Sequence, residues 1–382
     1  MVAQKSFSSP IRLIPDSPDR QMQDAPDILE MMVADMESAA PIYQATNYWA
    51  YYQNKTLEAL RSKGLFNLRR RSDGYFPSFG VTDAAPLPLA YFLKPGNTQD
   101  PDSTAMITPA ISEIHRLTLA GSPVGFGEMT LEDHYALIEE VCDARGHSVG
   151  LPPLSGLDLC LAGNPVAVER EGRYSTFTAP YYYGFAQFVA RHIDLRSIDT
   201  IIEIGPGSGK QAEMLMKLYP HLSLGLLDLA PQLYCTERLL STAFPDRAVP
   251  YTETRSAPES AAFEPGRVYF FPNSAIERIR PRGRVLFWNT ASFGEMEPEV
   301  VTNYAGHIAR FASALFLMQR FDGKQQGEPG KGGVLAQTTM ETYQAAFPAY
   351  RCVGKDIARR SNLMTPAHEG GKVYHNSFWE KL

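Results

Sequence analysis

A glycine-rich segment in the second half of the chain is the sequence feature best suited to bind a ligand. Residues 203–209 read Glu-Ile-Gly-Pro-Gly-Ser-Gly and lie between a strand-like apolar run and a helix-like pattern. Three glycines at alternate positions let the backbone turn tightly and approach a ligand closely. The free amides at the start of the following helix can bind a carboxylate or phosphate. Asp228 ends the next predicted strand, 19 residues after Gly209, where a carboxylate can accept both hydroxyls of a ribose.

The spacing of these glycines separates two classes of cofactor. The dinucleotide fingerprint is Gly-x-Gly-x-x-Gly, whereas this chain has Gly-x-Gly-x-Gly with a glutamate two residues before it. This pattern resembles motif I of class I S-adenosylmethionine-dependent methyltransferases. The resemblance implies that the acid before the glycines positions the methionine ammonium, the glycines line methionine and ribose, the second acid binds the ribose, and the next residue packs on adenine. These positions are Glu203, Gly205, Gly207, Gly209, Asp228 and Leu229. A dinucleotide enzyme and a plain strand-to-helix turn are the alternatives.

Two further segments are expected to reach the same cofactor. Asn273 and Ser274 follow the third predicted strand, where they can hydrogen-bond the adenine edge; capping the next helix is an equally good interpretation. Residues 181–183 are three tyrosines in the helix before the first strand, a helix that often lines the cofactor pocket in this superfamily. The resemblance therefore implies that the Tyr183 hydroxyl contacts the methionine carboxylate, with packing in the core as the alternative.

The segment after the fourth predicted strand is placed to face the methyl acceptor. Ligands of such sheets bind beyond the carboxyl ends of the strands, and residues 289–296 begin at that end. They resemble the Asn-x-x-Ser-Phe-x-Glu-Met block of a bacterial family of sugar O-methyltransferases, and residues 47–49, 64–70 and 163–165 resemble other blocks of it. The resemblance implies a small-molecule acceptor, either a sugar or another hydroxylated natural product.

Methyl transfer to a hydroxyl requires a group that accepts its proton as the new bond forms. Glu295 is the carboxylate that the sequence places best, and its alternative role is to stabilise the start of the following helix. His307 lies twelve residues later inside that helix and is the second candidate base, with packing as its simpler interpretation. Asn289 and Ser292 are expected to orient the acceptor or the cofactor. Trp49 is expected to offer an apolar face to a ring-shaped acceptor.

The elements that position these residues fall into three parts. Residues 1–27 contain four prolines and little periodicity, which predicts a disordered or extended arm. Residues 28–180 are expected to form a mainly helical domain that serves as a cap for substrate or as an assembly element. It has predicted helices over 28–36, 47–60, 110–119 and 130–144, and a loop-like stretch over 150–180. Residues 181–382 are expected to form the cofactor-binding domain.

Short apolar strands alternate with amphipathic helices in that last part, which predicts an α/β fold with a parallel, Rossmann-like sheet covered on both faces. The predicted helices span 181–192, 210–219, 232–244 and 298–312. The predicted strands span 200–204, 222–227, 268–271, 285–288 and 315–320, with an extra strand near 248–252 and a C-terminal edge hairpin formed by 350–357 and 372–378.

Composition excludes several other functions. The 382 residues include 36 Lys and Arg against 42 Asp and Glu, a net charge of -6 that argues against a dedicated nucleic-acid binder. No apolar run approaches the ~18 residues of a membrane span, and the N-terminus has no signal-like segment. Four cysteines without a CxxC pair indicate neither a zinc site nor a disulfide scaffold. A cytoplasmic protein without nucleic-acid or membrane partners is expected, and the sequence leaves a homo-oligomer open.

The leading hypothesis is thus an S-adenosylmethionine-dependent O-methyltransferase of small molecules. An N-methyltransferase on a related molecule and a catalytically silent cofactor-binding paralogue are the alternatives. Some sugar methyltransferases bind Mg²⁺ near the acceptor. Here the two strand-end acids Asp228 and Glu295 are separate, so the sequence supports no metal site.

Overall fold

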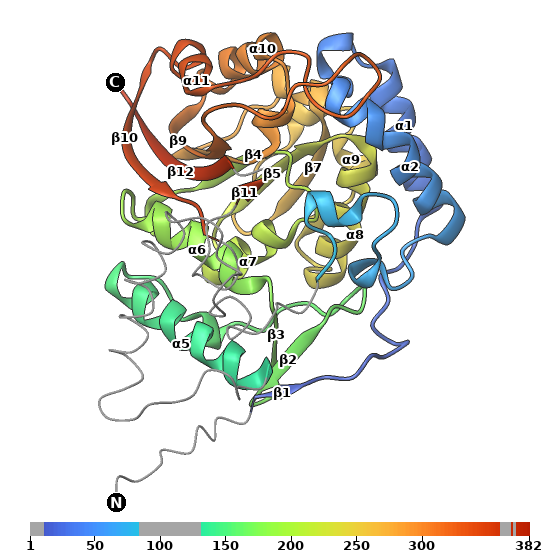
Figure 1. The fold of residues 1–382 in the computed structure, drawn as a ribbon, viewed down its shortest axis with the longest axis vertical. Coiled ribbons are helices and arrows are strands. Elements are labelled where there is room, and N and C mark those ends of the chain that lie inside the picture. The colour runs from blue at the N-terminus through green and yellow to red at the C-terminus, as the bar shows by residue number, and fades with distance from the viewer. Residues whose placement is uncertain (1–10, 84–130, 360–367, 370–371) are drawn as a thin grey trace, which may run out of the picture.

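The computed structural model describes residues 11–83, 131–359, 368–369 and 372–382. A central sheet crosses the molecule with helices on both faces (Figure 1). Its strands follow the order β10-β12-β9-β8-β4-β5-β7-β6, and all neighbours are parallel except those that pair with β12. The strands are β4 (Thr200–Ile204), β5 (Ser223–Asp228), β6 (Ala248–Val249), β7 (Val268–Pro272), β8 (Val285–Thr290), β9 (Ala312–Arg320), β10 (Tyr350–Ile357) and β12 (Lys372–Lys381), with β11 (His368–Glu369) paired to β12. The predicted α/β fold is confirmed.

Alternating side chains of the parallel strands enter two hydrophobic layers. Ile201 and Trp288 pack on one face of the sheet, whereas their neighbours Ile202 and Phe287 pack on the other. The helices α6 (Ala179–Ala190), α7 (Lys210–Leu218) and α8 (Ala230–Ala243) contribute to the first layer, and α10 (Pro298–Ile308) and α11 (Met340–Ala346) to the second. Burial on both faces explains why the strands are continuous apolar runs.

Predicted element boundaries agree with the structure to within a few residues over most of the sheet. Outside the sheet, the helix predicted over 47–60 is α2 (Asn47–Lys63), which ends at Gly64; this glycine has a φ of +55° and donates its amide to the Leu60 carbonyl at 2.8 Å. The extra strand expected near 248–252 is only two residues long, and α9 (Tyr251–Thr254) follows it. The helix predicted over 110–119 lies outside the described residues.

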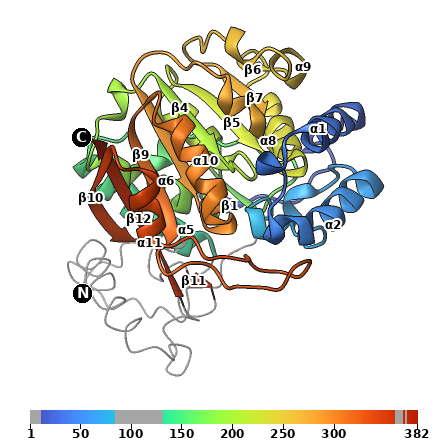
Figure 2. The same cartoon turned by 90° about the horizontal axis from the view of Figure 1, so that it is seen from above.

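The N-terminal segments lie against the sheet domain. Helix α1 (Pro26–Ser38) packs on α8, and α2 lies beside α1 (Figure 2). One buried hydrophobic cluster contains Leu29 of α1, Leu60 of α2 and Leu233 of α8. Helix α5 (Leu131–Ser148) contacts α6 and falls where a helix was expected. A shared buried layer of this kind positions N-terminal side chains at the carboxyl ends of the strands.

A small second sheet was not predicted. Strand β1 (Arg12–Leu13) pairs with β2 (Ala167–Arg170), which forms a hairpin with β3 (Arg173–Thr176). The stretch 150–180 was expected to be loop-like, and this expectation was wrong for residues 167–176. The turn at Glu171 and Gly172 has positive φ at both residues, a hairpin signature that the flanking charged residues obscured.

The C-terminal strands form the predicted antiparallel pair at one edge of the sheet. Strand β12 lies between β9 and β10, and β10 is the outer strand of the pair. The carboxyl end of β10 therefore lies at the same edge of the sheet as the ends of β4, β5 and β8. No helix within the described ranges is long and apolar enough to cross a membrane.

Candidate active site

A cleft opens beyond the carboxyl ends of β4, β5 and β8. Its volume is about 270 Å³, and its walls come from the glycine loop, the strand ends, α6 and the N-terminal segments. The lining residues are Trp49, Pro77, Ser78, Phe79, Gly80, Tyr181, Tyr182, Phe185, Gly205, Pro206, Gly207, Gln211, Asp228, Gln232, Thr290, Ala291, Ser292, Glu295 and Met318. Segments more than 200 residues apart in the sequence thus build one cavity.

The glycine loop needs its glycines for two separate reasons. Gly205, Gly207 and Gly209 all have φ between +60° and +78°, a region that side-chain-bearing residues rarely adopt. A Cβ at Gly205 would lie 2.4 Å from the Cβ of Ser292, and a Cβ at Gly207 would lie 2.6 Å from the Phe79 carbonyl oxygen. The loop therefore forms a cradle that any side chain would fill.

Asp228 holds the glycine loop from the end of β5. Its Oδ2 accepts a hydrogen bond from the Gly207 amide at 3.1 Å, and its Oδ1 accepts one from the Leu229 amide at 2.8 Å. Burial among protein atoms raises the pKa of the Asp228 carboxyl to about 7. The hydrogen bonds from the two amides partly oppose this rise in pKa. Leu229 itself is buried in the hydrophobic core next to the loop.

Glu203 lies in β4, two residues before Gly205; its carboxylate has no hydrogen-bond partner in the protein, and it is not among the residues that line the cleft. The residue is 1% exposed. Burial raises its pKa to about 8, and the nearby charge of Asp228 adds to the shift. An orphaned buried carboxylate is costly unless a ligand or water satisfies it. A cationic or hydrogen-bond-donating ligand in the cradle would do so.

A smaller cavity continues on the other side of Asp228. It is lined by Asp228 and Asn273 together with Met32 and Met36 of α1 and the Tyr43 ring. The Asn273 side-chain oxygen is buried without a partner. The volume of this smaller cavity is only about 10 Å³, the size of one water molecule. Ser274 does not line either cavity and lies half-buried in the short helical turn after β7.

Glu295 lies in the main cleft with both carboxylate oxygens engaged. Oε2 accepts a 2.7 Å hydrogen bond from the Trp49 indole, and Oε1 accepts a 2.7 Å hydrogen bond from the Lys324 ammonium. The ammonium group also lies over the Tyr48 ring, 4.3 Å from its centroid. The side chain of Glu295 is buried, and Thr46 bonds its backbone carbonyl at 2.8 Å. Two separate segments, residues 46–49 and the loop that carries Lys324, therefore hold Glu295 in one place.

Asn289 is not exposed to the cleft, although Ser292 is. Asn289 donates from Nδ2 to the Ile204 carbonyl and to Ser292 Oγ, both at 2.7 Å, and its Oδ1 accepts from Gln319 at 2.5 Å. Ser292 donates to the same Ile204 carbonyl at 2.9 Å. The expected contact between Asn289 and an acceptor is therefore replaced by a structural role, joining the end of β4 to the segment after β8.

Two other predicted site residues lie away from the cleft. The Tyr183 hydroxyl donates to the Pro152 carbonyl at 2.7 Å and is fully buried. Its neighbours Tyr181 and Tyr182 line the cleft instead, because successive residues of a helix point to different sides. His307 on α10 lies 3.1 Å from the Tyr43 hydroxyl, which also donates to Glu277, and does not line the cleft.

The three arginines at 69–71 act as structural anchors. Arg69 is buried and pairs with Asp83 at 2.6 Å, and Asp83 also pairs with Lys210, the first residue of α7, at 3.0 Å. Burial lowers the pKa of Lys210 to about 8. The paired charges fasten the segment that carries Phe79 to the helix that follows the glycine loop.

Several residues of the cleft carried no sequence signal. Phe79 comes from a Pro-Gly-rich connector, and Gln211 and Gln232 come from the first turns of α7 and α8. Lys324, which bonds Glu295, comes from a Gly-Lys-Gln-rich loop. Their proximity depends on tertiary packing alone. Among the residues that the structure describes, no group of three or more His, Cys, Asp or Glu is arranged to hold a metal ion.

No protein-family profile matches the sequence, and no curated protein matches it. Solved structures of similar fold include the mitomycin 7-O-methyltransferase MmcR, at 12% identity over 78% of this chain and 74% of that one with a TM-score of 0.35. The pyocyanin biosynthetic protein PhzM is 13% identical over 75% and 71% of the two chains, with a TM-score of 0.36. The magnesium protoporphyrin IX methyltransferase ChlM of Synechocystis PCC 6803 is 9% identical over 74% and 100%, with a TM-score of 0.34. Similarity this distant says nothing about activity, which has to be inferred from the residues of the cleft.

Proposed function

We propose that this chain transfers the methyl group of S-adenosylmethionine to an oxygen atom of a small hydroxylated molecule, such as a sugar or another natural product. The observation that carries the proposal is the arrangement of Gly207, Asp228 and Glu203. A glycine cradle, a carboxylate at the end of the next strand and an orphaned buried acid lie together at the carboxyl edge of a parallel sheet. A ribose and an ammonium group would satisfy these two acids.

The chain's residues suit this cofactor in three places. Glycines 205, 207 and 209 would hold its methionine and ribose, with Glu203 beneath the ammonium group. Asp228 would accept the ribose hydroxyls, since its carboxylate lines both cavities. Asn273, with its unpartnered amide oxygen, would accept a hydrogen bond from the adenine amino group. Bound there, the cofactor supplies an electrophilic methyl group.

The opposite wall of the cleft suits an acceptor. Trp49, Phe79 and Tyr181 present aromatic surface that holds a ring and excludes water. Positioning of this kind supplies much of the rate of methyl transfer. Apart from Asp228, Glu295 is the only carboxylate among the described residues that line the cleft. We assign to it the orientation of the acceptor hydroxyl and acceptance of its proton, with Lys324 and Trp49 fixing its position.

Equilibrium binding separates this proposal from its alternatives. Titration with S-adenosylhomocysteine should show saturable binding, whereas NAD should show none; the reverse preference would exclude a methyltransferase. A silent paralogue would bind S-adenosylhomocysteine yet transfer no label from methyl-labelled S-adenosylmethionine to any acceptor in a panel of hydroxylated sugars, phenols and amines. Within that panel, label on amines alone would favour the N-methyltransferase alternative over O-methylation.

A further inference from the structure

Asn47, the first residue of α2, binds a glycine-rich loop that follows β9. The loop comprises residues 323–338, between β9 and α11, and Lys324 lies near its start. The side-chain nitrogen of Asn47 donates to three backbone carbonyls of this loop at 3.2, 3.0 and 2.9 Å, those of Glu328, Lys331 and Gly333. Its side-chain oxygen accepts a hydrogen bond from the Gly330 amide at 2.9 Å. One asparagine thus binds four backbone positions in a segment more than 280 residues later in the sequence.

This loop is costly to order. Five of its residues are glycines, at positions 323, 327, 330, 332 and 333, and glycine loses more conformational freedom on folding than any other residue. Its tip, residues 328–331, is exposed and contains an ion pair between Lys331 and Glu328, of a kind that stabilises little. Three of the four Asn47 hydrogen bonds fall on this tip, where exposure leaves little packing to offset the cost of ordering.

The base of the loop places a cation in the candidate active site. The Lys324 side chain is 7% exposed, and its ammonium donates to Glu295 Oε1 at 2.7 Å and lies 4.3 Å from the centroid of the Tyr48 ring. A buried carboxylate keeps its charge only when a cation or hydrogen-bond donors replace the water that it has lost. Lys324 supplies that cation. The charged form of Glu295 is also the form that can accept a proton.

The tip and the base of the loop contact neighbouring residues of one helix. Asn47 binds the tip, and the adjacent Tyr48 contacts the Lys324 ammonium at the base. The loop also lies directly on the next turn of α2, since a Cβ at Gly332 would be 2.8 Å from the Tyr52 hydroxyl oxygen. A loop released from Asn47 would therefore separate from the surface that holds Lys324 in place.

We propose that Asn47 is a positioning residue for the methyl transfer, acting through the loop on Lys324 and through Lys324 on Glu295. This inference rests on the proposed function, in which Glu295 accepts the proton of the acceptor. Asn47 does not line the cleft, so its effect on the reaction is indirect. The hydrogen bonds of Asn47 determine the fraction of molecules in which Glu295 has its cation.

Limited digestion of the full chain with trypsin tests the first step without assuming any activity. Trypsin cleaves after lysine and needs an accessible side chain, so cleavage after the buried Lys324 requires the loop to leave α2. All proteins carry Lys331→Gln, because the exposed Lys331 would otherwise be cut first. Asn47→Ala should accelerate cleavage after Lys324 about tenfold or more, since the open form becomes more populated. Asn54→Ala, at an exposed position of the same helix, should not.

Rates of methyl transfer test the second step. With the acceptor of the panel above that takes up the most label, Asn47→Ala should lower kcat about fivefold or more, because small displacements of a catalytic group are costly. The affinity for S-adenosylhomocysteine should stay unchanged. In the Lys324→Met background, Asn47→Ala should cause no further loss, since a residue that acts only through Lys324 has no effect without it.

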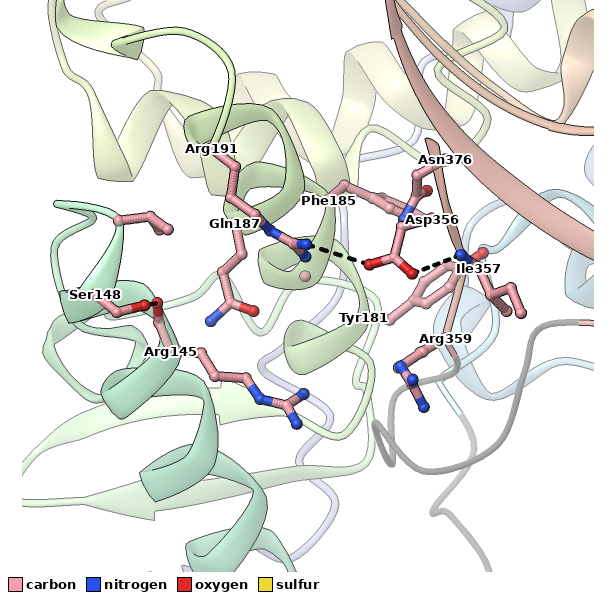
Figure 3. Close-up of a pocket in the computed structure, with 12 residues that line it drawn as sticks. Arg145, Ser148, Tyr181, Phe185, Gln187, Arg191, Asp356, Ile357, Arg359 and Asn376 are labelled. Carbon is pink, nitrogen blue, oxygen red and sulfur yellow. Dashed lines mark hydrogen bonds and ion pairs between the residues drawn. The ribbon is translucent and has the colours of Figure 1, made fainter. Parts of the chain in front are cut away.

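Two further variants distinguish positioning from a general loss of stability. Asn376→Ala removes a buried amide from a separate cavity, between α5, α6 and the end of β10 (Figure 3), and should leave kcat unchanged. Asn47→Asp keeps the size of the side chain but loses the donated hydrogen bonds, so it should match Asn47→Ala and replaces it if the alanine variant does not fold. Wild-type rates of cleavage after Lys324 in both Asn47 variants, or additive losses of kcat in the double variant, overturn the inference. Failure of the wild-type chain to bind S-adenosylhomocysteine would instead overturn the proposed function.

Discussion

The Trp49 indole donates a 2.7 Å hydrogen bond to Oε2 of Glu295 and so joins α2 to the segment after β8. The same carboxylate accepts from Lys324 through its other oxygen. A side chain held at both oxygens has little freedom to reorient. Its position relative to the cradle is thus set by the N-terminal helix as much as by the sheet.

The first prediction concerns this carboxylate. Glu295→Gln keeps the shape and removes the basicity, so turnover should fall by about 10²–10⁴, the usual contribution of a general base. Trp49→Phe removes one hydrogen bond and keeps the base, and should reduce turnover far less. Steady-state rates with labelled S-adenosylmethionine measure both. Equal losses in the two variants, or a matching loss of cofactor affinity, would mean that Glu295 only orders the cleft.

Asp228 is expected to determine cofactor affinity. Asp228→Ala removes the acceptor of the ribose hydroxyls and should weaken S-adenosylhomocysteine binding by about 1.5–3 kcal/mol, or roughly 10- to 150-fold. The exposed Asp246→Ala, on the loop before β6, is the matched control and should bind normally. Calorimetry with circular dichroism to verify folding gives the comparison. A folded Asp228→Ala protein with unchanged affinity would place the ribose elsewhere.

Cofactor affinity should also depend on pH. The pKa of Asp228 is raised to about 7, so its carboxyl becomes charged as the pH rises through that value. The charged form is the better acceptor for two hydroxyls, and binding of S-adenosylhomocysteine should therefore tighten between pH 6 and pH 8. In Asp228→Asn the part of this change centred near pH 7 should disappear. A wild-type affinity that is flat over this range would contradict the assignment.

Glu203 is expected to lower the stability of the unliganded protein and to strengthen cofactor binding. Its folded-state pKa of about 8 lies above the ordinary value of 4.5, so the folded protein holds an extra proton between these pH values. Stability of the unliganded protein then falls as pH rises through that window. Glu203→Gln should raise the thermal midpoint, with a larger difference from wild type at pH 8 than at pH 5, while cofactor affinity decreases. Calorimetric scans at both pH values test the sign.

The buried charges that fasten the Phe79 segment should be essential to folding. Asp83→Ala would leave Arg69 and Lys210 without their shared partner, which typically costs about 3–5 kcal/mol. Glu30→Ala breaks only the exposed pair with Arg61 and should cost less than about 1 kcal/mol. Denaturant unfolding of the two variants measures the difference. Similar small losses would show that the buried network is dispensable.

The sequence predicted the features that depend on a short local pattern of residues. The glycine loop, Asp228 and the alternation of strands with helices are each set by residues within one turn or one strand, and their positions in the structure match. Tyr183 shows the limit of this reasoning, because its helix was predicted correctly and yet the helix orientation exposes Tyr181 and Tyr182 instead.

The other features of the site depend on packing between residues that are far apart in the sequence. Glu295 was predicted to be near the acceptor, but its hydrogen-bond partners were not predicted. Trp49 lies 246 residues before Glu295 in the sequence, and Lys324 lies 29 residues after it. Nothing in their local sequence marks them as neighbours.

The water-sized cavity beside Asp228 has a kinetic consequence. Under the proposed function the adenine ring binds beside Asn273, and it does not fit in about 10 Å³, so Met32 and Met36 of α1 would have to change rotamer, or α1 would have to shift, before the cofactor could enter. Thioether side chains adapt to such changes at low cost. Under the proposed function, the spent cofactor must leave by the same route. The turnover rate would then be limited by the rate at which α1 separates from α8, a step remote from the reacting methyl group.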